Sequence, residues 1–287
     1  MHPIHSYLIC ATPHNGSTLL CEALTNTGVA GNPKEYFESL KASGLPRRPR
    51  EYFTTIESPE IAELLGDHSR LDEGPNTILR VSNYADYLAQ VLEEGTTPNG
   101  VFGDKLMWGY FDDFISNLRD IPSYRNLPLP ELLSTIFPDL HYIWVTRSDK
   151  VRQAVSLWKA IQTWTWREDE GPSAQLNHHE EHPRFNHHER HLRFHFEAIY
   201  HLVQQIIEHE HAWQRYFEQS AIQPFTVIYE DLAANYETSA LQILRYLGIS
   251  ISEYLVFAER RMKRQADGLS EEWVDQYHHL KRQRVSA

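Results

Sequence analysis

The stretch YLICATPHNGSTLLCEALTNTG (Tyr7–Gly28) reads as a short buried strand, a tight turn and a helix. Gly16 lets the main chain turn close to a ligand, and Ser17 and Thr18 open the helix. The N–H groups at a helix N-terminus and the positive end of its dipole favour an anion. The stretch therefore predicts an anion-binding turn at the end of a strand, although a plain turn with a capped helix fits these residues equally well.

The residues of this turn differ from the phosphate loop of enzymes that bind nucleoside triphosphates. The phosphate loop of nucleoside triphosphatases reads G-x-x-x-x-G-K-[ST]. Here Gly16 is followed directly by Ser17 and no glycine lies five residues before it, so an ATP or GTP hydrolase or a small kinase is disfavoured. His14 stands beside Asn15 where a permanently charged side chain would be expected. A bound polyanion should raise the pKa of His14 and favour the charged imidazolium.

The rest of the chain alternates between apolar strand patterns and helical patterns. Strands are predicted at Tyr7–Cys10, Gly100–Met107, His141–Thr146 and Phe225–Tyr229, and helices at Leu19–Thr25, Ile78–Leu92, Val151–Trp166, Leu192–Phe217 and Asp231–Leu247. Such alternation indicates an α/β fold with a parallel central sheet flanked by helices. No break in composition divides the chain, so a single domain over residues 1–287 is expected. Near the C-terminus, Ser270 is predicted to cap a further helix.

The composition limits the partners. A net charge of −12 disfavours nucleic acid and membrane surfaces, but a few local cations can still dominate a pocket for a small anion. The two cysteines, Cys10 and Cys21, lie in apolar surroundings, which is typical of buried thiols in a reducing compartment. The N-terminus lacks a basic start and a long apolar run. We therefore expect a cytoplasmic protein without stable membrane association.

Ten histidines fall between His178 and His211, some at helical i,i+4 spacing that can bind zinc. No cysteine and no H-E-x-x-H pattern accompanies them, which favours a solvated face, and no metal is expected.

A family resemblance begins at the turn. TPHNGSTLL resembles the 5′-phosphosulfate loop of sulfotransferases that use 3′-phosphoadenylyl sulfate (PAPS). Further segments resemble the bacterial trehalose 2-sulfotransferases and follow one another in that family's order: TNTGVAGNPKEYFESL, GVFGDKLMW, TRSDKVRQAVSLWKAIQT and RQADGLSEEWVDQY. The resemblance implies a P-loop-like sulfotransferase fold, PAPS as donor with PAP as product, no metal, and a homodimer.

The resemblance also assigns cofactor contacts. It implies that His14, Asn15, Gly16, Ser17 and Thr18 bind the 5′-phosphosulfate, that Arg147 and Ser156 bind the 3′-phosphate, and that Arg264 and Gln265 approach the adenosine. Without the resemblance, the residue types support fewer of these contacts. Arg147 follows a predicted strand, at the sheet edge where ligands collect, and guanidinium matches phosphate oxygens. An arginine there is nevertheless usually solvated or salt-bridged.

The reacting groups come from three segments. The resemblance makes Glu35, in GNPKEYF, the general base, whereas the residues alone do not separate it from Glu38 or from a solvated surface glutamate. Lys105 follows a core strand and needs an anion: it faces either the sulfuryl group or a carboxylate. His14 would meet the charge that develops on the leaving phosphate.

The acceptor contacts are the least specified. Trp108, Gln162 and Trp166 are candidates, and the last two share one face of a helix, although core packing is the usual role of tryptophan. The resulting hypothesis is transfer of a sulfuryl group to a hydroxyl of a trehalose-like carbohydrate or another small-molecule alcohol. Because relatives have Arg or Lys in place of His14, a catalytically degenerate homologue that binds PAP or PAPS is the alternative.

Overall fold

The computed structural model describes residues 2–38, 52–53, 58–65, 83–163, 192–250, 257–261 and 267–285. The chain forms two compact units. The first comprises Met1–Pro46, Thr77–Ser148 and Glu208–Arg260, and the second comprises Arg47–Asn76, Asp149–Ile207 and Arg261–Ala287. The expectation of a single domain stays a prediction.

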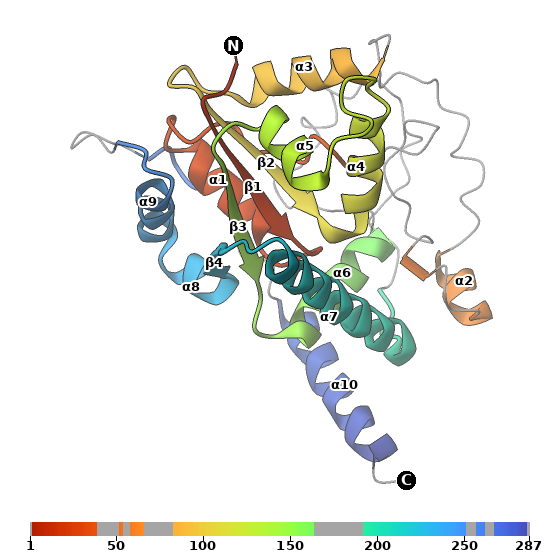
Figure 1. The fold of residues 1–287 in the computed structure, drawn as a ribbon. Coiled ribbons are helices and arrows are strands. Elements are labelled where there is room, and N and C mark those ends of the chain that lie inside the picture. The colour runs from red at the N-terminus through yellow and green to blue at the C-terminus, as the bar shows by residue number, and fades with distance from the viewer. Residues whose placement is uncertain are drawn as a thin grey trace, which may run out of the picture. The chain divides into compact units, whose positions relative to one another are not determined.

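The first unit contains a four-stranded sheet (Figure 1). Its strands are β1 (His5–Ala11), β2 (Val101–Met107), β3 (Leu140–Thr146) and β4 (Phe225–Ile228). They lie in the order β2-β1-β3-β4, and every neighbouring pair is parallel. The four predicted strands and the parallel α/β architecture are therefore confirmed, with boundaries that differ by at most two residues.

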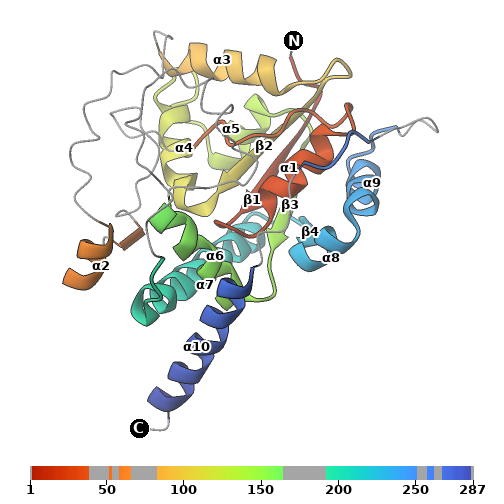
Figure 2. The same cartoon turned by 180° about the vertical axis from the view of Figure 1, so that it is seen from behind.

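Helices cover both faces of this sheet. In the first unit they are α1 (Ser17–Thr25), α3 (Tyr84–Gly95), α4 (Phe111–Arg119), α5 (Leu129–Ile136), α8 (Tyr229–Ala234) and α9 (Tyr236–Tyr246), with the short 3-10 helix η3 (Trp108–Tyr110) and the C-terminal part of α7 (Phe196–Gln219). Figures 1 and 2 show α1 over one face and α4 with α5 over the other. Leu8, Phe102 and Leu106 pack on the α4 side in an apolar cluster with Phe114 and Trp213.

Two predicted helices differ in extent, and α7 begins at Phe196 rather than at Leu192. Instead of a continuous helix over Asp231–Leu247, the chain forms α8 and α9, which are separated at Asn235. The Asn235 side chain donates to the main-chain oxygen of Asp231 at 3.3 Å. The backbone of Asn235, with φ −130° and ψ 52°, lies outside the helical region, and this ends α8.

The second unit is helical. It contains α2 (Pro59–Leu65), α6 (Lys150–Thr163), α10 (Gly268–Val285) and the first part of α7. Trp158 of α6 is fully buried, and it packs in one apolar cluster with Phe196 of α7 and Trp273 of α10. None of the helices in the described residues is long and apolar enough to cross a membrane.

The start of α10 differs from the sequence-based prediction. The cap of this helix is Asp267 rather than Ser270: Asp267 Oδ1 accepts from the Ser270 N–H at 2.8 Å. Asp267 also pairs with Lys159 of α6 at 2.6 Å. Although burial acts in the opposite direction, the hydrogen bonds from Lys159 and Ser270 lower the pKa of Asp267 to about 2.

We predict that Asp267→Ala lowers the free energy of unfolding by about 1 kcal/mol at neutral pH, because α10 loses its cap. A carboxylate with a lowered pKa stabilises the fold above its unfolded pKa. The difference from wild type should therefore shrink as the pH falls from about 4 towards 2 in urea denaturation. Asp275→Ala, at an exposed site on α10, is the control and should have little effect. An equal loss in the control, or no loss in the variant, would contradict the assignment.

Candidate active site

The strand order creates a switch point between β1 and β3. The chain leaves β1 for β2 on one side, and β3 lies on the other side of β1. Ligands of open α/β sheets bind outside the carboxyl ends of strands at such a point. The turn Thr12–Thr18 follows β1 and Arg147 follows β3. The two meet there, because Arg147 Nη1 donates to the main-chain oxygen of His14 at 3.3 Å.

A buried side chain within the turn, that of Asn15, holds the turn in place. The Asn15 side chain is fully buried; its Nδ2 donates to the Val145 oxygen at 2.7 Å and its Oδ1 accepts from the Ser17 N–H at 3.1 Å. Asn15 thus ties the turn to β3. Gly16 is the N-cap of α1 and has no side chain to cap the helix, and Asn15 satisfies the N–H of its first residue, Ser17. Anion binding at the start of α1 stays a prediction.

Tyr229 belongs to the site and was not found from the sequence. It lies directly after β4, and its ring packs under the guanidinium of Arg147 at 4.6 Å from the ring centroid. The same ring lies against Gly16, where a Cβ atom would stand 2.2 Å from Tyr229 Cδ2. Its place at the end of a predicted strand was the signal that the sequence offered.

Lys105 joins the turn to the predicted base. Its side chain is only 4% exposed; Nζ lies 2.8 Å from Glu35 Oε2 and donates to Thr18 Oγ1 at 3.2 Å. Of the two roles left open for Lys105, the ion pair with a carboxylate is present. That carboxylate is Glu35, so contact with Lys105 distinguishes Glu35 from Glu38 in a way that the sequence did not.

His14 is neutral at physiological pH in the free protein. Partial burial of the ring, together with the charges of Arg147 and Lys105, lowers the pKa of His14 to about 4. Two cations therefore already converge on the turn. The expected rise in pKa applies to the complex with a polyanion, which would oppose these two charges.

The comparisons with known proteins identify the family. The family model for Stf0 sulphotransferases matches residues 6–280. The chain belongs to the Stf0 sulphotransferase family. It is therefore an enzyme of the sulfotransferase class.

Two relatives match nearly the whole length of this family member. A trehalose 2-sulfotransferase from Mycolicibacterium smegmatis is 32% identical over 277 residues, covering 96% of this chain and 95% of the relative. A trehalose 2-sulfotransferase from Mycobacterium tuberculosis is 31% identical over 276 residues, covering 96% and 94%. Among solved structures, a sulfotransferase from Alicyclobacillus acidocaldarius matches with a TM-score of 0.45 and 14% identity, covering 98% of this chain and 96% of that one.

The other predicted contacts of this Stf0 sulphotransferase fall into three groups. Trp108 is half-buried in the first unit, where its ring stacks on Phe111 at 5.1 Å. In the second unit, the side-chain amide of Gln162 donates to the Arg193 oxygen at 3.1 Å and accepts from the Arg193 N–H at 2.9 Å. Ser156 lies half-buried on α6 in the second unit. Trp166, Arg264 and Gln265 lie outside the described residues. The acceptor and cofactor roles of all these residues stay predictions.

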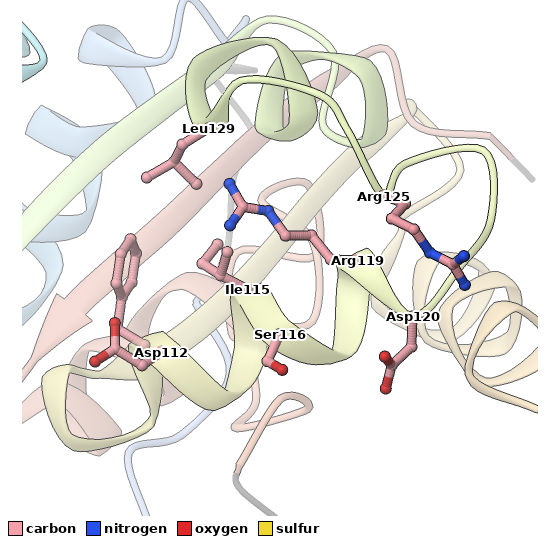
Figure 3. A pocket seen from close by; sticks show the side chains of 8 residues that line it. Asp112, Ile115, Ser116, Arg119, Asp120, Arg125 and Leu129 are labelled. Carbon is pink, nitrogen blue, oxygen red and sulfur yellow. The ribbon is translucent and has the colours of Figure 1, made fainter.

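A groove elsewhere in the first unit is distinct from this site. It has a volume of about 540 Å³ and lies along α4, with Asp112, Arg119 and Arg125 among its lining residues (Figure 3). Neither the turn nor Lys105 lines it. In the part of the chain that the structure describes, no group of His, Cys, Asp and Glu side chains could hold a metal ion, and His178–His191 lie outside that part.

We predict that Gly16→Ala disrupts the turn, because the residue has φ +90° and its Cβ would collide with Tyr229. The free energy of unfolding should fall by roughly 2–4 kcal/mol from strain and overpacking together. Gly28→Ala is the matched control, since Gly28 also has positive φ but a Cβ atom added there would have no neighbour within 4 Å. Urea denaturation should show a clearly larger loss at Gly16, and equal losses would refute the role of the Tyr229 contact.

Proposed function

We propose that this enzyme transfers a sulfuryl group from PAPS to a hydroxyl of a trehalose-like carbohydrate, with Glu35 as general base. The observation that carries the proposal is the position of Lys105. Its ammonium contacts Thr18, at the start of α1, and Glu35, on a separate segment, at 3.2 and 2.8 Å. One cation thus brings together the turn proposed to bind the donor and the proposed base, and this supports in-line transfer between a donor on the turn and an acceptor beside Glu35.

The residues of the turn fit PAPS. Gly16, the N-cap of α1, has no side chain and lets the main chain approach a ligand, and Arg147 supplies a guanidinium at the same edge. When bound, PAPS would supply the sulfuryl group that its 5′-phosphate carries. The acceptor oxygen would bond to sulfur as the bond from sulfur to the phosphate oxygen breaks, and the 5′-phosphate would leave as part of PAP. Ser17, Thr18 and Arg147 would hold its anionic groups. Ser156 is proposed for the 3′-phosphate on the family resemblance.

The protein's own groups have separate tasks in this scheme. Glu35 accepts the proton of the acceptor hydroxyl, and its side chain is 20% exposed, so that it can be reached. Lys105 holds Glu35 in place and offsets negative charge next to Thr18. His14 adds a hydrogen bond and, once protonated, a third positive charge beside Arg147 and Lys105.

The acceptor is proposed from the relatives. Both relatives are named trehalose 2-sulfotransferases, so trehalose is the first acceptor to assay with purified enzyme and PAPS. Addition of one SO₃ to trehalose by mass spectrometry would support the proposal. PAP binding without transfer to trehalose or to any alcohol in a metabolite extract would instead favour a degenerate homologue, and His14→Arg would then be expected to restore transfer. The cytoplasmic location and the homodimer also stay predictions.

We predict that Glu35→Gln lowers kcat by roughly 10²–10⁴-fold, because the amide cannot accept the proton. The affinity for PAP should be unchanged, since the amide oxygen can still accept a hydrogen bond from Lys105. Initial rates and calorimetric titration with PAP separate these two effects. Glu38→Gln, three residues further on, is the matched control and should retain kcat. A Glu35→Gln enzyme with wild-type kcat would remove this residue from the role of base.

We predict that PAP binding is linked to protonation of His14. The pKa of His14 is about 4 in the free protein, and a bound polyanion should raise it, so affinity should strengthen as the pH falls towards 4. PAP's own phosphates titrate as well, and their protonation acts in the opposite direction. His14→Gln therefore serves as the reference in titrations between pH 5 and about 8. Parallel pH profiles for the two proteins would contradict the linkage.

A further inference from the structure

A carboxyl group on the far face of a core strand has no role in the scheme above. Asp104 precedes Lys105 on β2, and side chains of successive strand residues point to opposite faces. Lys105 reaches Thr18 on the α1 side, so Asp104 lies on the α4 side, between Phe102 and Leu106 of the apolar cluster. Its side chain is completely buried. A buried carboxyl group in such surroundings is costly unless it makes specific hydrogen bonds.

The hydrogen bond that Asp104 makes is to the segment that carries Glu35. We call Asn32–Glu38 the Glu35 segment. It runs beside β2, where Lys34 forms a parallel bridge with Asp104 and the Lys105 N–H donates to the Lys34 oxygen at 2.8 Å. In a continued parallel ladder the N–H of Tyr36 would donate to a main-chain oxygen of β2. It donates instead to Asp104 Oδ1, at 3.1 Å.

Glu35 is therefore held on both sides. Lys34 is fixed by the N–H of Lys105, and Tyr36 is fixed by Asp104. The rest of the segment is also anchored: the Tyr87 hydroxyl donates to the Tyr36 oxygen, and the Asn32 N–H donates to the Gly95 oxygen at 3.0 Å. Since the residues on either side of Glu35 are fixed to β2, its carboxylate is directed at Lys105 of the same strand.

We propose that Asp104 is a positioning residue for sulfuryl transfer, whose buried carboxyl group holds the Tyr36 N–H and thereby keeps Glu35 in contact with Lys105. This inference rests on the proposed function. Asp104 acts through its acceptor oxygen rather than through charge. Within the described residues Oδ2 has no hydrogen-bond partner. Burial raises the pKa of Asp104 well above its usual range, and the nearby Glu35 carboxylate raises it further, against the hydrogen bond from Tyr36 and the charge of Lys105.

A pair of variants tests this role. Asp104→Asn keeps an acceptor of the same shape without charge, whereas Asp104→Leu keeps the approximate volume and removes the acceptor. We expect Asp104→Asn to retain most of the transfer activity with PAPS and trehalose. Asp104→Leu should lower kcat by about 10²-fold, because Glu35 is no longer fixed at its working distance. PAP affinity should be unchanged in both variants, since the turn and Arg147 are not touched. Asp112→Leu, the same change at an exposed site on α4, is the control.

A second measurement does not depend on catalysis. Amide hydrogen exchange at Tyr36 should remain slow in wild type and in Asp104→Asn, and it should become fast in Asp104→Leu. If wild type fails to sulfate trehalose but this exchange pattern holds, the proposed function fails on that acceptor and the positioning contact stands. If wild type transfers sulfate and Asp104→Leu keeps both its kcat and its Tyr36 protection, the positioning role is wrong.

Two further outcomes would overturn the proposal. Equal losses of kcat in Asp104→Asn and Asp104→Leu would mean that the negative charge, not the acceptor oxygen, is required. If Asp104→Leu does not fold, Asp104→Ala takes its place. Failure of both to fold, while Asp104→Asn folds, would assign Asp104 to the stability of the first unit rather than to the placement of Glu35.

Discussion

The site depends on one buried ammonium group. Lys105 extends from the sheet-edge strand β2 and is almost fully removed from water, so it requires partners with negative or acceptor character. It finds Glu35 and Thr18. Removing one partner of a buried ion pair typically costs about 3–5 kcal/mol, so these contacts constrain the fold as well as the chemistry. The Glu35 segment, the start of α1 and β2 are thereby held in one arrangement before any ligand binds.

The order of the strands explains why segments far apart in the sequence meet. With β1 between β2 and β3, the turn after β1 can be contacted by Lys105 from one side and by Arg147 from the other. Burial lowers the pKa of His14 most, and these two cations lower it further, so two positive side chains lie close to the turn in a chain with a net charge of −12. A local anion site can therefore exist in an acidic protein.

The sequence predicted the features that depend on local patterns, whereas contacts between distant segments could not be predicted in the same way. Apolar runs gave the four strands, and the spacing after β1 indicated the turn and α1. Helix α4 was missed even though its apolar residues have helical spacing. Nothing in the order of residues tells Glu35 from Glu38, because the difference lies in Lys105, seventy positions away. The buried amide of Asn15 ties the turn to β3, a contact with a distant segment that the sequence did not predict. The contact of Tyr229 with Arg147 depends on the pairing of β3 with β4, which the sequence did not predict.

The register of β2 combines these constraints. Lys105 pairs with Ile9 and Asp104 pairs with Leu8, which places the ammonium on the α1 face and the carboxyl group on the α4 face. A shift of one residue would exchange the two faces. It would bring a carboxyl group towards Thr18, where an anion is expected to bind. It would also bury the ammonium on the α4 face beside Leu8 and remove Phe102 and Leu106 from the apolar cluster. The polar contacts of the site and the apolar core of the first unit therefore select the same register. In that register, two adjacent residues of β2, one with an ammonium and one with a buried carboxyl group, hold the Glu35 segment from both faces of a single strand.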